Sequence, residues 1–230
     1  MLRTNLAYAG IERPLRTIAV TSPGPNEGKS TIGVNLASVL AQAGSRVLLV
    51  DADLRHPTLH TVFKRRRKPG LSDLIALNSD PAQAILPTGL DGLFFLPCGT
   101  MPPSPSDLLA LTATRVLFKR LAGEYDYVVF DTPPVLVGAD SPIICGLVDT
   151  TIMVVRDGRT ASEAIGYACT AILGGGARLS GLVLNEAKHY GRYYYYDKYH
   201  RHYAKRGEEE TEPSGGAPAM GAGGSEKADS

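Results

Sequence analysis

The chain has 230 residues, which is enough for one large domain or two small ones, and a formal net charge of +1 at pH 7. This near balance gives no overall basic field and so argues against a nucleic-acid partner. We find no apolar run of about 18 residues, no signal peptide, and no pairing or metal-ligand spacing among the three cysteines, so we expect a soluble protein in a reducing, cytoplasmic compartment.

The first nine residues have the character of the end of a helix whose beginning is absent. A short apolar strand is predicted at about 16–22, followed by the glycine-bearing loop Ser-Pro-Gly-Pro-Asn-Glu-Gly-Lys-Ser-Thr at 22–31. An amphipathic helix from Thr31 to Ala43 comes next, and Gly44 is placed to end it. Its predicted apolar face, at helical spacing, consists of Ile32, Leu36, Val39 and Leu40.

This strand, loop and helix are the context that a phosphate-binding loop requires. Successive backbone N–H groups can turn inward, and the helix N-terminus adds partial positive charge. Lys29 would meet the β- and γ-phosphates, and Ser30 would offer its hydroxyl to Mg²⁺. The alternative is a glycine-rich turn before a helix, because the usual first glycine is replaced by Pro23. The candidate nucleotide-binding residues here are Gly24, Pro25, Asn26, Glu27, Gly28, Lys29, Ser30 and Thr31.

Two further strands end in acids. The aliphatic run at 46–50 reads as a strand buried on both faces and leads into Asp51 and Asp53. Because ligands of open α/β sheets bind at the carboxyl ends of the strands, these acids are expected to face the phosphates and their metal. The strand at 126–131 has the form of a Walker B strand, in which Asp131 would support the Mg²⁺ shell. Simple solvation of a strand end is the alternative for each acid.

The basic run Lys-Arg-Arg-Arg-Lys at 64–68 reads either as a solvated loop or as a docking patch for anionic lipid or an acidic segment. We further predict a short helix at 71–77, a strand at 93–97, and a helix capped by Ser104 or Ser106 that ends near Ala122. Later elements are a helix at 140–147, a strand at 150–155, a helix at 160–173 and a last strand that ends at Asn185. Asn185 could bind a base edge or be a turn residue.

Strands that alternate with helices predict an α/β fold with a mostly parallel central sheet and helices on both faces. This is the three-layer α/β/α arrangement of P-loop NTPases, and it places the three motif loops on one edge. The expected chemistry is Mg²⁺-dependent phosphoryl transfer from ATP or a similar nucleotide.

The character of the chain changes after Asn185. Residues 188–206 form a basic cluster that holds seven of the eleven tyrosines, and residues 207–230 are too poor in apolar side chains to fold, so we expect them to be disordered. We therefore divide the chain into a domain at 1–187, the tyrosine-rich cluster at 188–206 and a tail at 207–230. The candidate phosphoacceptors are Tyr190, Tyr193, Tyr194, Tyr195, Tyr196, Tyr199 and Tyr203.

Four features together resemble the cytoplasmic domain of the bacterial protein-tyrosine kinases of the P-loop type. They are the Gly-Lys-Ser-Thr loop at 28–31, Val-Asp-Ala-Asp-Leu-Arg at 50–55, Phe-Asp-Thr-Pro-Pro at 130–134 and the tyrosine cluster. The resemblance covers roughly residues 1–203. It implies an ATP- and Mg²⁺-dependent tyrosine kinase that phosphorylates neighbouring copies within a ring and regulates capsular or extracellular polysaccharide polymerisation and export.

The resemblance also implies roles and partners. Asp51 would accept or orient the tyrosine hydroxyl proton, and Asp53 and Asp131 would support the metal shell. The implied catalytic set is Lys29, Asp51, Asp53 and Asp131, and the metal set is Ser30, Asp51 and Asp131. A transmembrane activator or polysaccharide co-polymerase, fused or separate, would hold the domain at the inner membrane face, and a tyrosine phosphatase would reverse its action.

The ring contact of the family is similar to a helix with a Glu-x-x-Arg-x-x-Arg pattern. Here only Arg3 and the following Thr-Asn-Leu correspond to it, so residues 1–15 are interpreted as the remnant of an oligomerisation helix and its linker. The expected consequence is a weakened ring and a fragment of a longer chain.

Two other functions remain open. One is a MinD/ParA-like ATPase that acts as a nucleotide-switched dimer, although such proteins typically carry a lysine where this chain has Gly24. The other is a structural scaffold with an inactive nucleotide site, which the presence of all three motif acids disfavours.

Overall fold

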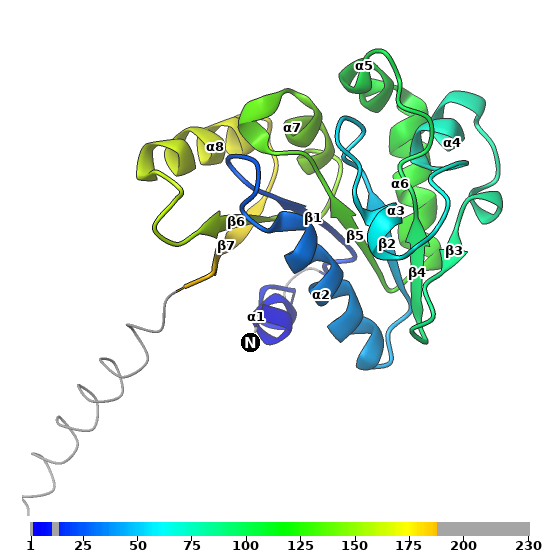
Figure 1. The fold of residues 1–230 in the computed structure, drawn as a ribbon, viewed down its shortest axis with the longest axis horizontal. Helices are drawn as coiled ribbons and strands as arrows, with labels where there is room; N and C mark the ends of the chain where they lie inside the picture. The colour runs from blue at the N-terminus through cyan, green and yellow to red at the C-terminus, as the bar shows by residue number, and fades with distance from the viewer. Residues whose placement is uncertain (1, 11–13, 188–230) are drawn as a thin grey trace, which may run out of the picture. The chain divides into compact units, whose positions relative to one another are not determined.

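A seven-stranded sheet is the centre of the computed structural model, which describes residues 2–10 and 14–187 (Figure 1). Its order is β3-β4-β2-β5-β1-β6-β7, and every neighbouring pair is parallel except β3 and β4. The mostly parallel α/β fold is therefore confirmed. The strands are β1 (Thr17–Thr21), β2 (Val47–Asp51), β3 (Leu86–Pro87), β4 (Leu93–Leu96), β5 (Tyr127–Asp131), β6 (Thr150–Arg156) and β7 (Leu179–Asn185).

Helices cover both faces of this sheet, as expected for three layers (Figure 1). Leu6, Leu36, Leu40 and Leu59 place α1, α2 and α3 against one face, and apolar residues of α4 to α8 belong to the core of the other. The helices are α1 (Leu2–Ala9), α2 (Lys29–Gln42), α3 (Leu59–Val62), α4 (Leu71–Leu77), α5 (Pro105–Ala110), α6 (Thr112–Glu124), α7 (Asp140–Cys145) and α8 (Ser162–Gly174), with 3-10 turns η1 (Pro81–Gln83) and η2 (Val135–Val137).

The strand register brings the predicted motifs together. β1, β2 and β5 are buried over nearly their whole length, which explains their continuous aliphatic sequences. In the parallel ladders Asp131 is level with Val20 on one side and with Asp51 on the other. The phosphate loop and both acidic strand ends therefore lie at the same edge of the sheet.

Several local predictions needed correction. Val39 was assigned to the buried face of the second helix, but its side chain is 44% exposed, because the buried stripe is narrower and runs through Leu36, Ala37 and Leu40. The single helix expected to end near Ala122 is two helices. Leu111 has an extended backbone between them, and the Leu108 carbonyl accepts both the Leu111 N–H and the Thr114 hydroxyl.

Other local predictions agree with the structure. Gly44 has a φ of 90°, the left-handed conformation expected where a helix ends at glycine. The short helix predicted at 71–77 is α4. None of the described helices is long and apolar enough to cross a membrane. The tyrosine cluster and the tail at 207–230 lie outside the described residues, so their predicted states stay predictions.

Candidate active site

The loop between β1 and α2 has the tight turns that bring its backbone around an anion. Gly28 adopts a φ of 92° directly before α2, and Asn26 adopts 62°. A side chain at position 28 would also meet the Asn185 amide nitrogen 2.1 Å from its Cβ. Glycine is thus required there for two reasons, its conformation and the close approach of β7. This local geometry is compatible with a phosphate-binding loop, and the binding of phosphate stays a prediction.

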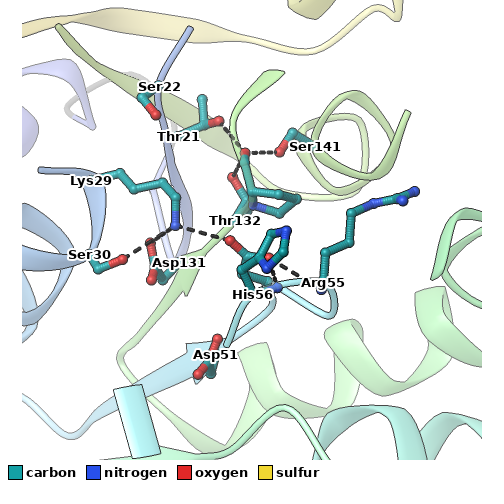
Figure 2. Close-up of polar contacts among 12 residues, drawn as sticks. Thr21, Ser22, Lys29, Ser30, Asp51, Arg55, His56, Asp131, Thr132 and Ser141 are labelled. Atoms are coloured by element: carbon teal, nitrogen blue, oxygen red, sulfur yellow. Dashed lines mark hydrogen bonds and ion pairs between the residues drawn. The ribbon is translucent and has the colours of Figure 1, made fainter. Parts of the chain in front are cut away.

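Lys29 is the centre of the site (Figure 2). Its ammonium group lies 3.2 Å from Asp53 Oδ2, 3.5 Å from Asp131 Oδ1 and 3.3 Å from the Ser30 hydroxyl. Burial alone would lower the pKa of Lys29, but the charges of Asp131 and Asp53 outweigh it and raise the pKa. Lys29 is therefore a permanently charged group that joins three separate loops.

Asp53 and Asp131 are held in different ways. The second oxygen of Asp53 accepts backbone N–H groups of Arg55 and His56 at 3.2 and 2.8 Å, which fixes the carboxylate in the loop. Asp131 is fully buried, and burial raises its pKa despite the opposing charge of Lys29. Its Oδ2 atom has no hydrogen-bond partner among the described residues. A buried carboxylate oxygen in this state is suited to a cation or an ordered water.

Asp51 lies apart from this group (Figure 2). Its side chain is fully buried, accepts the Leu59 N–H at 3.1 Å and leaves Oδ1 without a partner among the described residues. Burial, together with the charge of Asp131, raises the pKa of Asp51 to about 7. Asp51 is not among the residues that line the cleft. In this conformation the Asp51 carboxyl is therefore closed off from the cleft and bonded to the Leu59 backbone.

A cleft of about 540 Å³ opens above Lys29. It brings the predicted phosphate loop and Asp53 together with an apolar wall that sequence reasoning had not assigned to the site. That wall consists of Pro133, Pro134 and Val137. It is fastened to β1, because the Thr21 hydroxyl donates to the Pro133 carbonyl at 2.9 Å and the Thr132 hydroxyl to the Val20 carbonyl at 3.1 Å.

Sequence reasoning also missed an ion pair at the outer end of the cleft. Arg55 forms a bidentate pair with Asp140, with N–O distances of 2.7 and 3.1 Å, although the two residues are 85 positions apart. The Asp140 side chain is only 1% exposed, and its charge raises the pKa of Arg55. The pair fixes the loop after β2 to the start of α7. The only sequence signal was Arg55 itself, beside two acids.

Asn185 is near the site, but in this structure its amide contacts the protein. It donates to the Glu27 carbonyl at 3.0 Å, and so ties the end of β7 to the phosphate loop. Arg156 reinforces this clamp, because it donates to the Asn26 carbonyl at 3.3 Å and forms an ion pair with Glu186. The predicted contact of Asn185 with a base edge stays a prediction.

Glu27 places a carboxyl group inside the phosphate loop. Its Oε1 accepts the Gly24 N–H at 3.2 Å, and burial raises its pKa, against the effect of that hydrogen bond. Gly24 has room for no larger residue without displacement of Glu27, because a Cβ there would lie 3.3 Å from Oε1. The Glu27 side chain thus links two positions within the same loop by a hydrogen bond.

The site fits a nucleotide phosphate chain and a hard cation. Within the described residues no cluster of three or more His, Cys, Asp or Glu side chains is arranged to hold a metal alone. Mg²⁺ in phosphate-binding sites is usually held by one or two protein oxygens, substrate phosphates and water. The unpartnered Oδ2 of Asp131 and the nearby Ser30 hydroxyl offer such oxygens.

Comparisons with known proteins agree with this architecture. Residues 15–165 match the family model described as an AAA domain. The chain is 37% identical over 187 residues to the tyrosine-protein kinase YwqD of Bacillus subtilis, with 81% of this chain and 79% of that protein covered. The solved chimerical protein CapA2B2 superposes with a TM-score of 0.77 at 34% identity, covering 81% of this chain and 82% of the other.

A more distant solved structure shares the fold. The septum site-determining protein MinD of Pyrococcus horikoshii, complexed with Mg-ADP, has a TM-score of 0.65 at 25% identity, covering 77% of this chain and 71% of the other. The alignment with YwqD spans most of both chains, and its sequence identity of 37% is higher than the 25% identity to MinD. The chain therefore belongs to the bacterial tyrosine-protein kinases, nucleotide-binding enzymes that share the P-loop fold of MinD.

Proposed function

We propose that this kinase transfers the γ-phosphoryl group of ATP, with Mg²⁺, to tyrosines of its own C-terminal cluster. The observation that carries the proposal is the Lys29 ammonium, which lies within 3.5 Å of carboxylates from two further motif loops. Such an arrangement places one charged donor and two acids where a phosphate chain would lie at a helix N-terminus. Phosphoryl transfer needs little more than positioning and charge stabilisation from the protein.

Each residue has a defined task in this mechanism. Lys29 leaves its ion pairs to bind the β- and γ-phosphates, and backbone N–H groups at 26–30 hold the remaining oxygens. Ser30 and Asp131 would hold Mg²⁺, which neutralises charge on the phosphates when bound. Asp53, fixed by two backbone N–H groups, faces the Lys29 side of the site and supports this shell.

Asp51 is proposed to assist the acceptor. A tyrosine hydroxyl has an ordinary pKa near 10, so it benefits from a carboxylate that takes up its proton as the new bond forms. A pKa of about 7 makes Asp51 a stronger base than an ordinary carboxylate. At pH 7, however, the Asp51 carboxyl group is protonated in about half of the molecules. The buried position of Asp51 means that catalysis also requires movement of the segment at 53–59.

The tyrosine cluster is proposed to be both substrate and switch. Residues 188–206 contain six Lys and Arg against one Asp, a formal charge of six minus one, or +5. An unmodified segment is thus attracted to a nucleotide-filled site on a neighbouring copy. Each phosphotyrosine adds about −1.5 to −2 charges, so about three modifications cancel or reverse the charge and would loosen the assembly.

The wider role follows from the family resemblance. We propose ring assembly with further copies, control of capsular or extracellular polysaccharide polymerisation and export, and activation by a transmembrane co-polymerase, with a tyrosine phosphatase as the reversing partner. Addition of the activator's juxtamembrane segment should then raise the rate of autophosphorylation. Full activity of the dilute chain without that segment would contradict the need for an activator.

The test of the central proposal is intact mass after incubation with ATP and Mg²⁺, followed by mapping of the modified sites. A mixture of inactive Lys29→Met protein and active protein lacking residues 190–203 isolates transfer between copies. Phosphate on the tyrosine cluster of the inactive protein is expected. ATP hydrolysis without any protein phosphate would instead support the MinD/ParA-like switch. In the mixture, absence of phosphate from the tyrosine cluster of the inactive protein at high concentration would exclude transfer between subunits.

A further inference from the structure

The basic run at 64–68 has no part in the chemistry above. Four of its five side chains are exposed, and the fifth, Arg67, is half-buried. No acid lies within ion-pair distance of these five cations in the part of the chain that the structure describes. The acid closest in sequence, Asp73, is occupied by backbone N–H groups of Gly70 and Thr100. The positive charge of the run is therefore uncompensated.

The backbone of the run is anchored at both ends. Phe63, just before it, packs on Phe95 in the core with ring centroids 5.0 Å apart. At the other end the Arg67 carbonyl accepts the Gly99 N–H at 3.1 Å. Between them Arg65 donates to the Pro87 carbonyl at 3.1 Å. The cations are thus presented on a fixed segment, which reduces the entropy lost when a partner binds.

Two apolar side chains adjoin the cations. Val62 is 58% exposed and lies two positions before the run, and Met101 is 47% exposed, with its sulfur 3.3 Å from an Arg67 nitrogen. Exposed apolar groups beside several cations are typical of protein surfaces that bind at the membrane interface. In such a contact the apolar groups enter the headgroup region and the cations bind lipid phosphates. An acidic protein segment would need only the cations.

We propose that the run at 64–68, together with Val62 and Met101, docks on the surface of an anionic lipid bilayer. The ligand chemistry is the headgroup phosphate, for which the three arginines offer planar, bidentate donors. The attraction is local, because the net charge of the whole chain is only +1. This contact would hold the described domain at a membrane surface.

The experiment is sedimentation of the full, unphosphorylated chain with vesicles of phosphatidylcholine, with and without about one third phosphatidylglycerol. Each cation near an anionic surface contributes about 1 kcal/mol, so the Arg66→Gln/Lys68→Gln variant should bind the anionic vesicles roughly 30-fold more weakly. Both side chains are exposed and form no hydrogen bond or ion pair among the described residues, so the fold should be unaffected. The matched control is Arg115→Gln/Lys119→Gln on α6, which loses the same charge and, like the test variant, keeps the basic cluster at 188–206.

A second variant separates lipid from a soluble acidic partner. Val62→Ser/Met101→Ser keeps all five cations and should weaken vesicle binding roughly tenfold by the loss of apolar burial. Equal vesicle binding by the Arg66→Gln/Lys68→Gln protein and its control would overturn the proposal. A second result would also overturn it. If the Arg66→Gln/Lys68→Gln protein kept its binding to vesicles and lost binding only to a phosphotyrosine peptide of residues 188–206, the surface would recognise a protein segment.

Discussion

The two sides of the site, which we call the phosphate wall and the acid wall, are built on different physical principles. The phosphate wall, residues 22–31, is shaped by backbone conformation. The Ser22 hydroxyl within it, and Asn185 and Arg156 outside it, donate to its main-chain carbonyls. The acid wall, around Asp53, Asp131 and Asp140, is held by ion pairs with Lys29 and Arg55. The phosphate wall should therefore tolerate single losses, whereas the acid wall should respond strongly to changes in charge and pH.

Lys29 is the one residue that belongs to both walls, so its loss should have the largest effect. Lys29→Met is expected to lower the rate of tyrosine phosphorylation by roughly 10³-fold or more, because the phosphates lose their charged donor. The measurement is phosphotyrosine formation against time, with circular dichroism to show that the variant is folded. Autophosphorylation at the wild-type rate in a folded variant would refute the assignment.

Asp51→Asn should lower kcat roughly 100-fold while nucleotide affinity changes little, because its proposed task belongs to the transition state. Titration with a fluorescent nucleotide and single-turnover kinetics separate the two quantities. If kcat stays near the wild-type value and only ATP binding weakens, Asp51 is a binding residue of the acid wall.

The same substitution should also change how the free energy of unfolding depends on pH, because it removes a buried titratable group. The pKa of Asp51 is raised from 3.8 to about 7, so the folded protein binds more protons than the unfolded chain between those values. The contribution of Asp51 to stability is thus complete below pH 4 and is lost as the pH rises through 7. The free energy of unfolding of Asp51→Asn, measured relative to that of the wild type, should increase by about 1 to 4 kcal/mol when the pH is raised from 5 to 8. Urea unfolding at both pH values measures the change, and an unchanged difference would contradict the raised pKa.

Arg55→Gln should destabilise the acid wall more modestly. It leaves the buried Asp140 without its partner, but Arg55 is 37% exposed, so screening reduces the cost to about 1–3 kcal/mol. A double-mutant cycle with Asp140→Asn should give a coupling energy above about 1 kcal/mol. Arg120→Gln, which removes two exposed ion pairs with Asp80 and Glu124, is the matched control and should not change stability measurably. Additive effects of the two substitutions would mean that the pair does not fasten the loop.

Asn185→Ala should have the smallest effect, since it removes one neutral hydrogen bond to the phosphate wall. A loss of about 1 kcal/mol corresponds to roughly fivefold weaker nucleotide binding. If Asn185 only clamps the loop, the affinities for ATP and GTP should fall equally in a titration. A fall confined to ATP would show that Asn185 also reads the base edge.

Much of the fold was accessible from sequence because its signals are local. Continuous aliphatic runs predict strands buried on both faces, as for β2 and β5, and the glycine and lysine before α2 predict the phosphate loop. The break at Leu111 was not predicted, because the surrounding sequence is compatible with one continuous helix. The hydrogen bond from Thr114 to the Leu108 carbonyl across the break is a contact that no periodic pattern indicates. The exposure of Val39 likewise depends on how wide a stripe the sheet covers.

The sequence by itself determined the chemical inventory of the site, namely a phosphate loop, its lysine and three acids at strand ends. Tertiary structure decided which of these groups touch. Asp51 and Asp53 are two residues apart, yet only Asp53 reaches Lys29, while Asp51 is buried beneath the loop. Asp140 entered the description only through Arg55, 85 positions away. Asn185 was a candidate from sequence, but its contact with the Glu27 carbonyl, 158 positions away, was not predicted. Such contacts depend on strand order and loop path, and a periodic pattern carries no information on either.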